Sequence, residues 1–121
     1  MSIFEGEPMN IEIVEREKYD ILKVSGSIKI GESKDQFVQS LKKELEKKLQ
    51  CLMIDFAEVN YIDSNGIGEL VGYLDKFKEA QAQLILIAPQ SRIQNLLKIT
   101  RLDQIFSIYI NEEQAINALK F

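Results

Sequence analysis

One short stretch of the chain combines a hydroxyl, a carboxylate and a lightly covered backbone, a pattern that suits a phosphate group. Its residues are Asp63, Ser64, Asn65, Gly66, Ile67 and Gly68. The stretch follows the apolar segment 52–57 and opens a run of apolar residues at helical spacing. Free backbone N–H groups and the positive end of the helix dipole both stabilise negative charge at a helix start. We therefore predict that Ser64 is the N-cap of a helix, at a position that favours a phosphate.

The other predicted helix starts have a different sequence. Ser33, Ser91 and Asn111 are each followed three residues later by glutamine, which forms a capping box. Ser64 is followed by Ile67 at that distance, so no side chain is expected to reach back to it. Two glycines also occupy this first turn, and each costs about 1 kcal/mol relative to alanine inside a helix. They indicate either a surface that a partner approaches closely or a helix that packs tightly on the sheet.

Residues that most enzymes need for catalysis are missing from this sequence. It has no histidine and one cysteine, Cys51, which excludes a zinc site of the His/Cys type as well as Ser-His-Asp and Cys-His catalytic groups. Ser64 therefore has no imidazole base to make it a nucleophile, whereas a serine that a kinase modifies needs none. We predict that the protein is not an enzyme and that it holds no metal and no cofactor.

Two other kinds of site have partial support. Gly66, Gly68 and Gly72 suggest a dinucleotide-binding loop, but residues 58–63 intervene after the strand, and the next strand ends without the acid that holds a ribose. Asp55, near the predicted end of a buried strand, suggests a receiver-like domain that is phosphorylated on aspartate. Such a domain also needs a carboxylate pair after its first strand to hold magnesium, and this pair is missing.

The composition is that of an ordinary globular chain, with 121 residues, 45% apolar residues, 28% charged residues and a net charge of −4. The lysines between residues 42 and 48 are interleaved with glutamates, which argues against a nucleic-acid surface. No apolar run approaches the roughly 20 residues that span a bilayer. The acidic start lacks the features of a signal peptide, and a single cysteine forms no internal disulfide. We therefore expect a cytoplasmic protein without membrane insertion.

Hydrophobic periodicity predicts the order strand, strand, helix, strand, helix, strand, helix, strand, helix. The strands are expected near 11–13, 22–24, 51–57, 84–88 and 106–110, and the helices from residues 33, 64, 91 and 111. Strands joined by single helices favour parallel neighbours, whereas the opening hairpin makes the sheet mixed. We predict one α/β domain over 1–121, with a mostly parallel central sheet of about five strands, about four helices and a loosely ordered lead-in at 1–9.

The pattern Asp-Ser-x-Gly-[Ile/Leu]-Gly, after a buried strand and a Tyr-Ile step, resembles the phosphorylation loop of anti-sigma factor antagonists in the STAS domain family. The length and the order of elements are also similar over nearly the whole chain. The similarity includes Gly26, at the end of the second predicted strand, and the segment 99–106, in which Arg101 stands where a glycine is common. The resemblance implies a STAS-like domain from a bacterium, with a regulatory and non-enzymatic role.

In that family the serine directly after the aspartate accepts the phosphate, and the corresponding residue is Ser64. The resemblance implies that the unphosphorylated protein binds an anti-sigma factor with serine kinase activity and so frees a sigma factor. Phosphorylation would end this binding, and a PP2C-type phosphatase would restore it. The alternative is a STAS-like docking subunit of a larger complex, such as a lipid-transport ABC system, in which Ser64 is not phosphorylated.

The resemblance also implies a partner-binding surface made of Lys29 and the stretch 63–68. Family members often carry an aspartate where this chain has Lys29, so the surface departs from that of related antagonists. A lysine near Ser64 would attract a phosphate and stabilise the phosphorylated form. Asp63 has two possible roles, since it either caps the start of the helix or orients the serine and contacts the partner.

Overall fold

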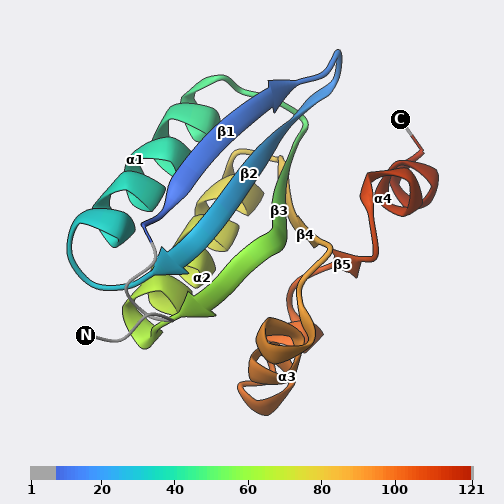
Figure 1. The fold of residues 1–121 in the computed structure, drawn as a ribbon. Helices are drawn as coiled ribbons and strands as arrows, with labels where there is room; N and C mark the ends of the chain where they lie inside the picture. Colours follow the sequence, from blue (N-terminus) through green and yellow to red (C-terminus); the bar gives the residue numbers. More distant parts are fainter. Residues whose placement is uncertain (1–7, 121) are drawn as a thin grey trace.

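The computed structural model describes residues 8–120, and in this part of the chain five strands form one sheet that is accompanied by four α-helices (Figure 1). In chain order the elements are β1 (Asn10–Glu15), β2 (Tyr19–Ile28), α1 (Glu32–Glu46), β3 (Cys51–Ile62), α2 (Ser64–Glu79), β4 (Gln83–Ile87), α3 (Ser91–Ile99), a 3₁₀ turn (Leu102–Gln104), β5 (Ile108–Tyr109) and α4 (Glu112–Leu119).

The strands lie in the sheet in the order β1-β2-β3-β4-β5. β1 and β2 form an antiparallel hairpin, and every other neighbouring pair is parallel. Each parallel pair is joined through at least one helix, because a parallel connection must carry the chain back to the same end of the sheet. The predicted α/β fold, with a mixed and mostly parallel sheet, is confirmed.

Helices cover both faces of this sheet. α1, α2 and α3 pack on one face, where Phe37, Leu70 and Leu97 join the larger core. Figure 1 shows α1 and α2 lying side by side behind the strands. α4 packs on the other face through Ala115, in a smaller core that contains Cys51. Burial raises the pKa of the Cys51 thiol to about 12, so this thiol is an unreactive part of the core.

Four strands differ in length from the prediction. β1 (Asn10–Glu15) and β2 (Tyr19–Ile28) are longer at both ends than the predicted 11–13 and 22–24. β3 continues to Ile62 instead of ending at residue 57, because its second half pairs with the end of β2. Val59 and Ile62 in this extension are buried although polar residues separate them. β5 contains two residues instead of five, because its pairing with β4 stops where that strand ends at Ile87. Asp55 consequently lies in the middle of β3 and not near its end.

Two of the three predicted capping boxes are wrong. α1 starts one residue earlier than predicted, with Gly31 at the N-cap in a conformation (φ 112°) that glycine tolerates best. The Ser33 hydroxyl instead exchanges hydrogen bonds with the backbone of Lys29. Ser91 is already helical, with Gln90 before it at the N-cap. Only the third prediction is right among the described helices, since the Asn111 side chain accepts a hydrogen bond from the Gln114 N–H at 2.8 Å.

Residues 1–7 of the predicted lead-in lie outside the described part of the chain. Met9, at the end of that segment, is buried in the larger core. Gly26 of β2 adopts a φ of +89°, and a Cβ atom there would lie 2.2 Å from the carbonyl oxygen of Pro8. A glycine is therefore required at this position because the backbone before β1 passes directly over it. Across residues 8–120, none of the helices has the length and apolar content of a membrane span.

Two carboxylates and one ammonium group form a cluster where β2 begins and α1 ends. Asp20 and Glu44 are each 2% exposed. The Lys47 ammonium nitrogen lies 2.7 Å from Asp20 Oδ2 and 2.8 Å from Glu44 Oε2. Burial and the neighbouring Asp20 carboxylate raise the pKa of Glu44 to about 7. Burial also acts to raise the pKa of Asp20, but its hydrogen bonds with Glu44 and Lys47 lower it overall, so Asp20 carries the charge that balances the ammonium group.

Replacing Glu44 by glutamine should flatten the pH dependence of stability. A carboxyl group whose pKa is raised in the folded state stabilises the fold below its unfolded pKa, and this contribution is lost as the pH rises through the folded value of about 7. From about pH 5 to pH 8, we expect the free energy of unfolding of the native protein to fall by about 2 kcal/mol relative to Glu44→Gln. Urea unfolding at several pH values in this range measures the difference. The prediction is contradicted if the free energy of unfolding changes with pH equally in the two proteins.

Candidate functional site

Ser64 is the first residue of α2, and it is exposed. The prediction that it is the N-cap is wrong, since the residue with extended backbone before the helix is Asp63. The Asp63 side chain accepts a hydrogen bond from the Gly66 N–H at 2.9 Å. Because a neighbour caps the helix, the Ser64 hydroxyl is not needed for that role, and within residues 8–120 it takes part in no hydrogen bond.

The Asp63 carboxylate connects the start of α2 to the loop between β2 and α1. Its second oxygen accepts a hydrogen bond from the Ile30 N–H at 2.8 Å. In addition, the Asp63 N–H donates to the Ile28 carbonyl at 3.0 Å. Partial burial acts to raise the pKa of Asp63, but the N–H donors of Gly66 and Ile30 lower it overall, so the carboxylate is ionised at neutral pH. Of its two predicted roles, the structure gives Asp63 the capping role.

The two glycines of the first turn have different surroundings. A Cβ atom on Gly66 would lie 2.8 Å from Ile62 and 3.0 Å from Ile28, so this glycine lets α2 pack tightly on the sheet. A Cβ atom on Gly68 would meet nothing within 4 Å, so packing does not require a glycine there. Asn65 is the second residue of α2. Ile67 is half-buried against the larger core.

Ser64 lies at the edge of a groove between the end of β3 and α3, with a volume of about 550 Å³. The groove is mostly apolar. The residues that line it are Tyr61, Ile62, Asp63, Ser64, Arg92, Ile93, Asn95, Leu96 and Ile99. Ile99 is 80% exposed, and Ile30, which is hydrogen-bonded to Asp63, is 68% exposed. Exposed isoleucines near an exposed serine are typical of a surface that another protein covers.

Lys29 does not line this groove. It is half-buried in the loop between β2 and α1, where its backbone N–H and carbonyl both form hydrogen bonds with the Ser33 hydroxyl. Its side chain lines a separate hollow of about 310 Å³, together with residues from the start of α1. The loop itself is tied to the Ser64 region through Asp63. The structure thus brings residues 63–68 together on one helix start and places Lys29 next to them on a different surface.

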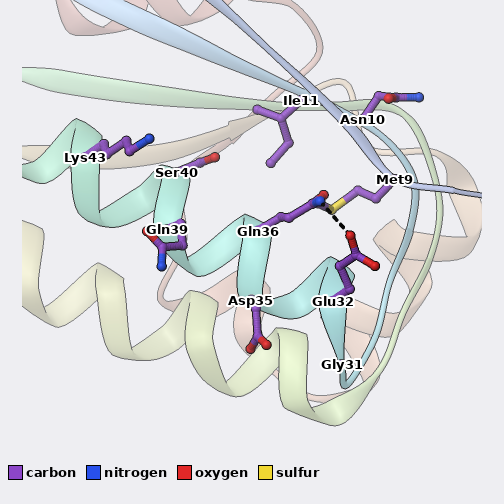
Figure 2. Close-up of a pocket in the computed structure, with 10 residues that line it drawn as sticks. All are labelled: Met9, Asn10, Ile11, Gly31, Glu32, Asp35, Gln36, Gln39, Ser40 and Lys43. Carbon is purple, nitrogen blue, oxygen red and sulfur yellow. Dashed lines mark hydrogen bonds between the residues drawn. The ribbon is translucent and has the colours of Figure 1, made fainter.

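A larger hollow of about 790 Å³ lies between β1 and α1 (Figure 2). Polar side chains of α1 form much of its wall, and Gln36 there donates a hydrogen bond to Glu32 at 3.3 Å. None of the residues predicted to form a functional site lines this hollow. Its size therefore does not make it the candidate site.

Arg92 and Ile99 were not identified from the sequence as site residues. Both belong to α3, at helical spacing that puts them on one face of the helix. The Arg92 Nη1 lies 3.4 Å from the Asn60 carbonyl, which keeps its side chain near the end of β3. The exposed isoleucine on an otherwise amphipathic helix is a signal in the sequence, but its position opposite Ser64 depends on how α3 packs.

The groove residues offer charge, through Asp63 and Arg92, and apolar contact, through residues such as Ile99. The described residues contain no cluster of three or more side chains suited to a metal. Neither α2 nor α3 has an acidic residue in its first turn, whereas α1 and α4 each have two. Among the groove residues, Asp63 is therefore the one negative charge that offsets the positive dipole ends of α2 and α3. A negative group on Ser64 would be added at a place of favourable potential.

Comparison with known proteins gives a consistent result. The model of the STAS domain matches residues 10–115. An anti-sigma-B factor antagonist from Listeria monocytogenes is 39% identical over 57 residues, which cover 47% of this chain and 50% of that protein. The match thus spans half the length of this relative. A second relative of the same name, from Staphylococcus aureus, is 25% identical over 104 residues, which cover 86% of this chain and 94% of the relative.

Two solved structures share the fold. The anti-sigma factor antagonist from Mycobacterium paratuberculosis superposes with a TM-score of 0.86 at 18% identity, covering 96% of this chain and 97% of that one. The Bacillus cell fate determinant SpoIIAA in its phosphorylated form superposes with a TM-score of 0.68 at 17% identity, covering 93% of this chain and 99% of that one.

Removing the Asp63 carboxylate should destabilise the fold. We expect Asp63→Ala to lower the free energy of unfolding by about 1–2 kcal/mol, because the Gly66 and Ile30 N–H groups both lose their acceptor. Asp63→Ser is the matched control, since a serine caps the helix but is too short to reach Ile30 as well, and it should lose less. Urea denaturation measures both variants. A stability of Asp63→Ala equal to that of the native protein would contradict the bridging role.

The two glycines provide a second test, because alanine brings the same gain in helix propensity at either position. Gly68→Ala should raise the free energy of unfolding by about 0.5–1 kcal/mol, since its Cβ meets open space. Gly66→Ala should lower it by about 1–3 kcal/mol, because the new methyl group is forced against Ile28 and Ile62. Thermal unfolding of the two variants measures the difference. The prediction is contradicted if both variants become more stable or both become less stable.

Proposed function

Because this chain belongs to the STAS domain family, we propose that it is an anti-sigma factor antagonist that is controlled by phosphorylation of Ser64. In its unphosphorylated form it binds an anti-sigma factor through the groove and the start of α2. This binding occupies the anti-sigma factor and frees a sigma factor. The domain over 1–121 acts as a binding module and does not itself catalyse a reaction.

The partner in this proposal is also the kinase. It transfers the γ-phosphoryl group of ATP to Ser64 Oγ, so that an O–P bond forms, the bond from the γ-phosphorus to the ADP oxygen breaks, and the hydroxyl proton passes to a base of the kinase. A PP2C-type phosphatase reverses the change, with water attacking the phosphorus and inorganic phosphate leaving. No base is needed in this chain for either step.

The observation that carries the proposal is the exposed Ser64 hydroxyl at the edge of a mostly apolar groove. A phosphate there adds a charge of nearly −2 to a groove that contains the exposed Ile99, which a partner would otherwise cover. Removing such a charge from water when a partner covers an apolar surface costs several kcal/mol, enough to abolish micromolar binding. The relatives named as anti-sigma-B factor antagonists and the phosphorylated form of SpoIIAA support the same reading.

We predict that Ser64→Asp loses binding to the anti-sigma factor whereas Ser64→Ala retains it. The affinity of Ser64→Asp should fall by at least about 100-fold, because aspartate places a permanent charge at the edge of the groove. Calorimetry with the purified anti-sigma factor from the same cell measures both affinities. Asp35→Ala, an exposed substitution in α1 away from the groove, serves as the control and should bind normally.

Equal binding by Ser64→Asp and Ser64→Ala would contradict the switch. Intact-mass measurement of the protein from its native cell, with and without phosphatase treatment, shows directly whether Ser64 carries phosphate. Co-purification with a transporter ATPase, together with the absence of phosphate, would favour the docking subunit of a lipid-transport complex instead.

A further inference from the structure

We propose that Arg92 is the counter-charge of the phosphate on Ser64, so that the phosphorylated form contains a phosphoserine–arginine pair across the groove. This inference rests on the proposed phosphorylation of Ser64. It assigns a positioning role to a residue of α3 that lies 28 positions away in the sequence. The relevant chemistry is recognition of a phosphate dianion by a guanidinium group.

Arg92 faces the same groove as Ser64. Both residues line it, and Arg92 is the one basic residue among those that do. Its side chain is exposed, and its single hydrogen bond in the described part of the chain is a long one of 3.4 Å from Nη1 to the Asn60 carbonyl. Within residues 8–120, no carboxylate lies within ion-pair distance of Arg92. Most of the five N–H donors of the guanidinium group are therefore open to a new acceptor.

The position of Arg92 within its own helix also favours an anionic partner. It is the second residue of α3, where the helix dipole disfavours a positive charge, and the first turn has no acidic residue to offset this. A phosphate next to Arg92 supplies the missing negative charge. The planar guanidinium group also matches two phosphate oxygens at once, which a lysine cannot do.

Lys29 is the rival for this role, and its location argues against it. Lys29 lines the hollow beside Ser33 and Gln36 and not the groove that contains Ser64. Phosphorylation therefore has two consequences in this proposal. It adds charge at the edge of the groove, and it occupies the one arginine that a partner could otherwise contact there.

The test uses phosphoserine installed at position 64 during translation, so that no kinase is required. The second pKa of this phosphoserine, which is near 6 in an unperturbed residue, is measured by ³¹P NMR titration of the full chain. A nearby cation favours the dianion and lowers this pKa. We expect Arg92→Gln to raise it by at least about 0.3 units, as for an exposed ion pair, and Arg92→Lys to give an intermediate value.

Arg101→Gln and Lys29→Gln are the controls, since the first removes an exposed arginine outside the groove and the second removes the rival cation. Both should leave the phosphoserine pKa unchanged. An unchanged pKa in Arg92→Gln, or a shift produced by Lys29→Gln instead, would overturn the proposal. The outcome is independent of whether cells phosphorylate Ser64, which the intact-mass measurement decides separately.

Discussion

The geometry of the candidate site depends on the Asp63 carboxylate. Its two oxygens hold two different pieces of backbone, the first turn of α2 through Gly66 and the loop after β2 through Ile30. These pieces come from segments more than 30 residues apart, and the extended pairing of β2 with β3 up to Ile62 brings them together. Because Asp63 accepts the hydrogen bonds from both N–H groups, the hydroxyl of the adjacent Ser64 is not needed to hold the structure together. An exposed serine that the fold does not use can change its charge with little cost to the fold.

The order and type of the elements were predictable from the sequence because apolar residues alternate or recur at helical spacing along most of the chain. The errors concern element boundaries that are set by contacts between residues far apart in the sequence. Nothing local shows that β3 continues to Ile62, since its second half mixes polar residues with Val59 and is held by the end of β2. The helix start at residue 32 was missed for a related reason, since Gly31 takes a positive φ and the Lys34 N–H bonds the backbone carbonyl of Lys29 instead of a capping side chain.

The position of the site was predictable to within one residue, but its surroundings were not. The stretch 63–68 opens α2 as the motif suggests, although Asp63 and not Ser64 is the cap. Lys29 was expected beside Ser64 because the family resemblance places that position near the phosphorylation loop, yet it lines another hollow. Arg92 and Ile99 lie on α3, and only the packing of that helix on β3 shows that they share a groove with Ser64. Contacts between residues of separate elements arise from tertiary packing, and no regular spacing in the sequence predicts them.

The cluster of Asp20, Glu44 and Lys47 lies at the start of β2, whereas the loop that touches Asp63 follows the end of the same ten-residue strand. At about 3.3 Å per residue, the two regions are separated by roughly 25 Å. Substitutions so far apart, with no shared contacts, add their effects on stability almost independently. Substitutions at one end of the sheet can therefore raise thermal stability without disturbing the proposed partner-binding surface at the other end.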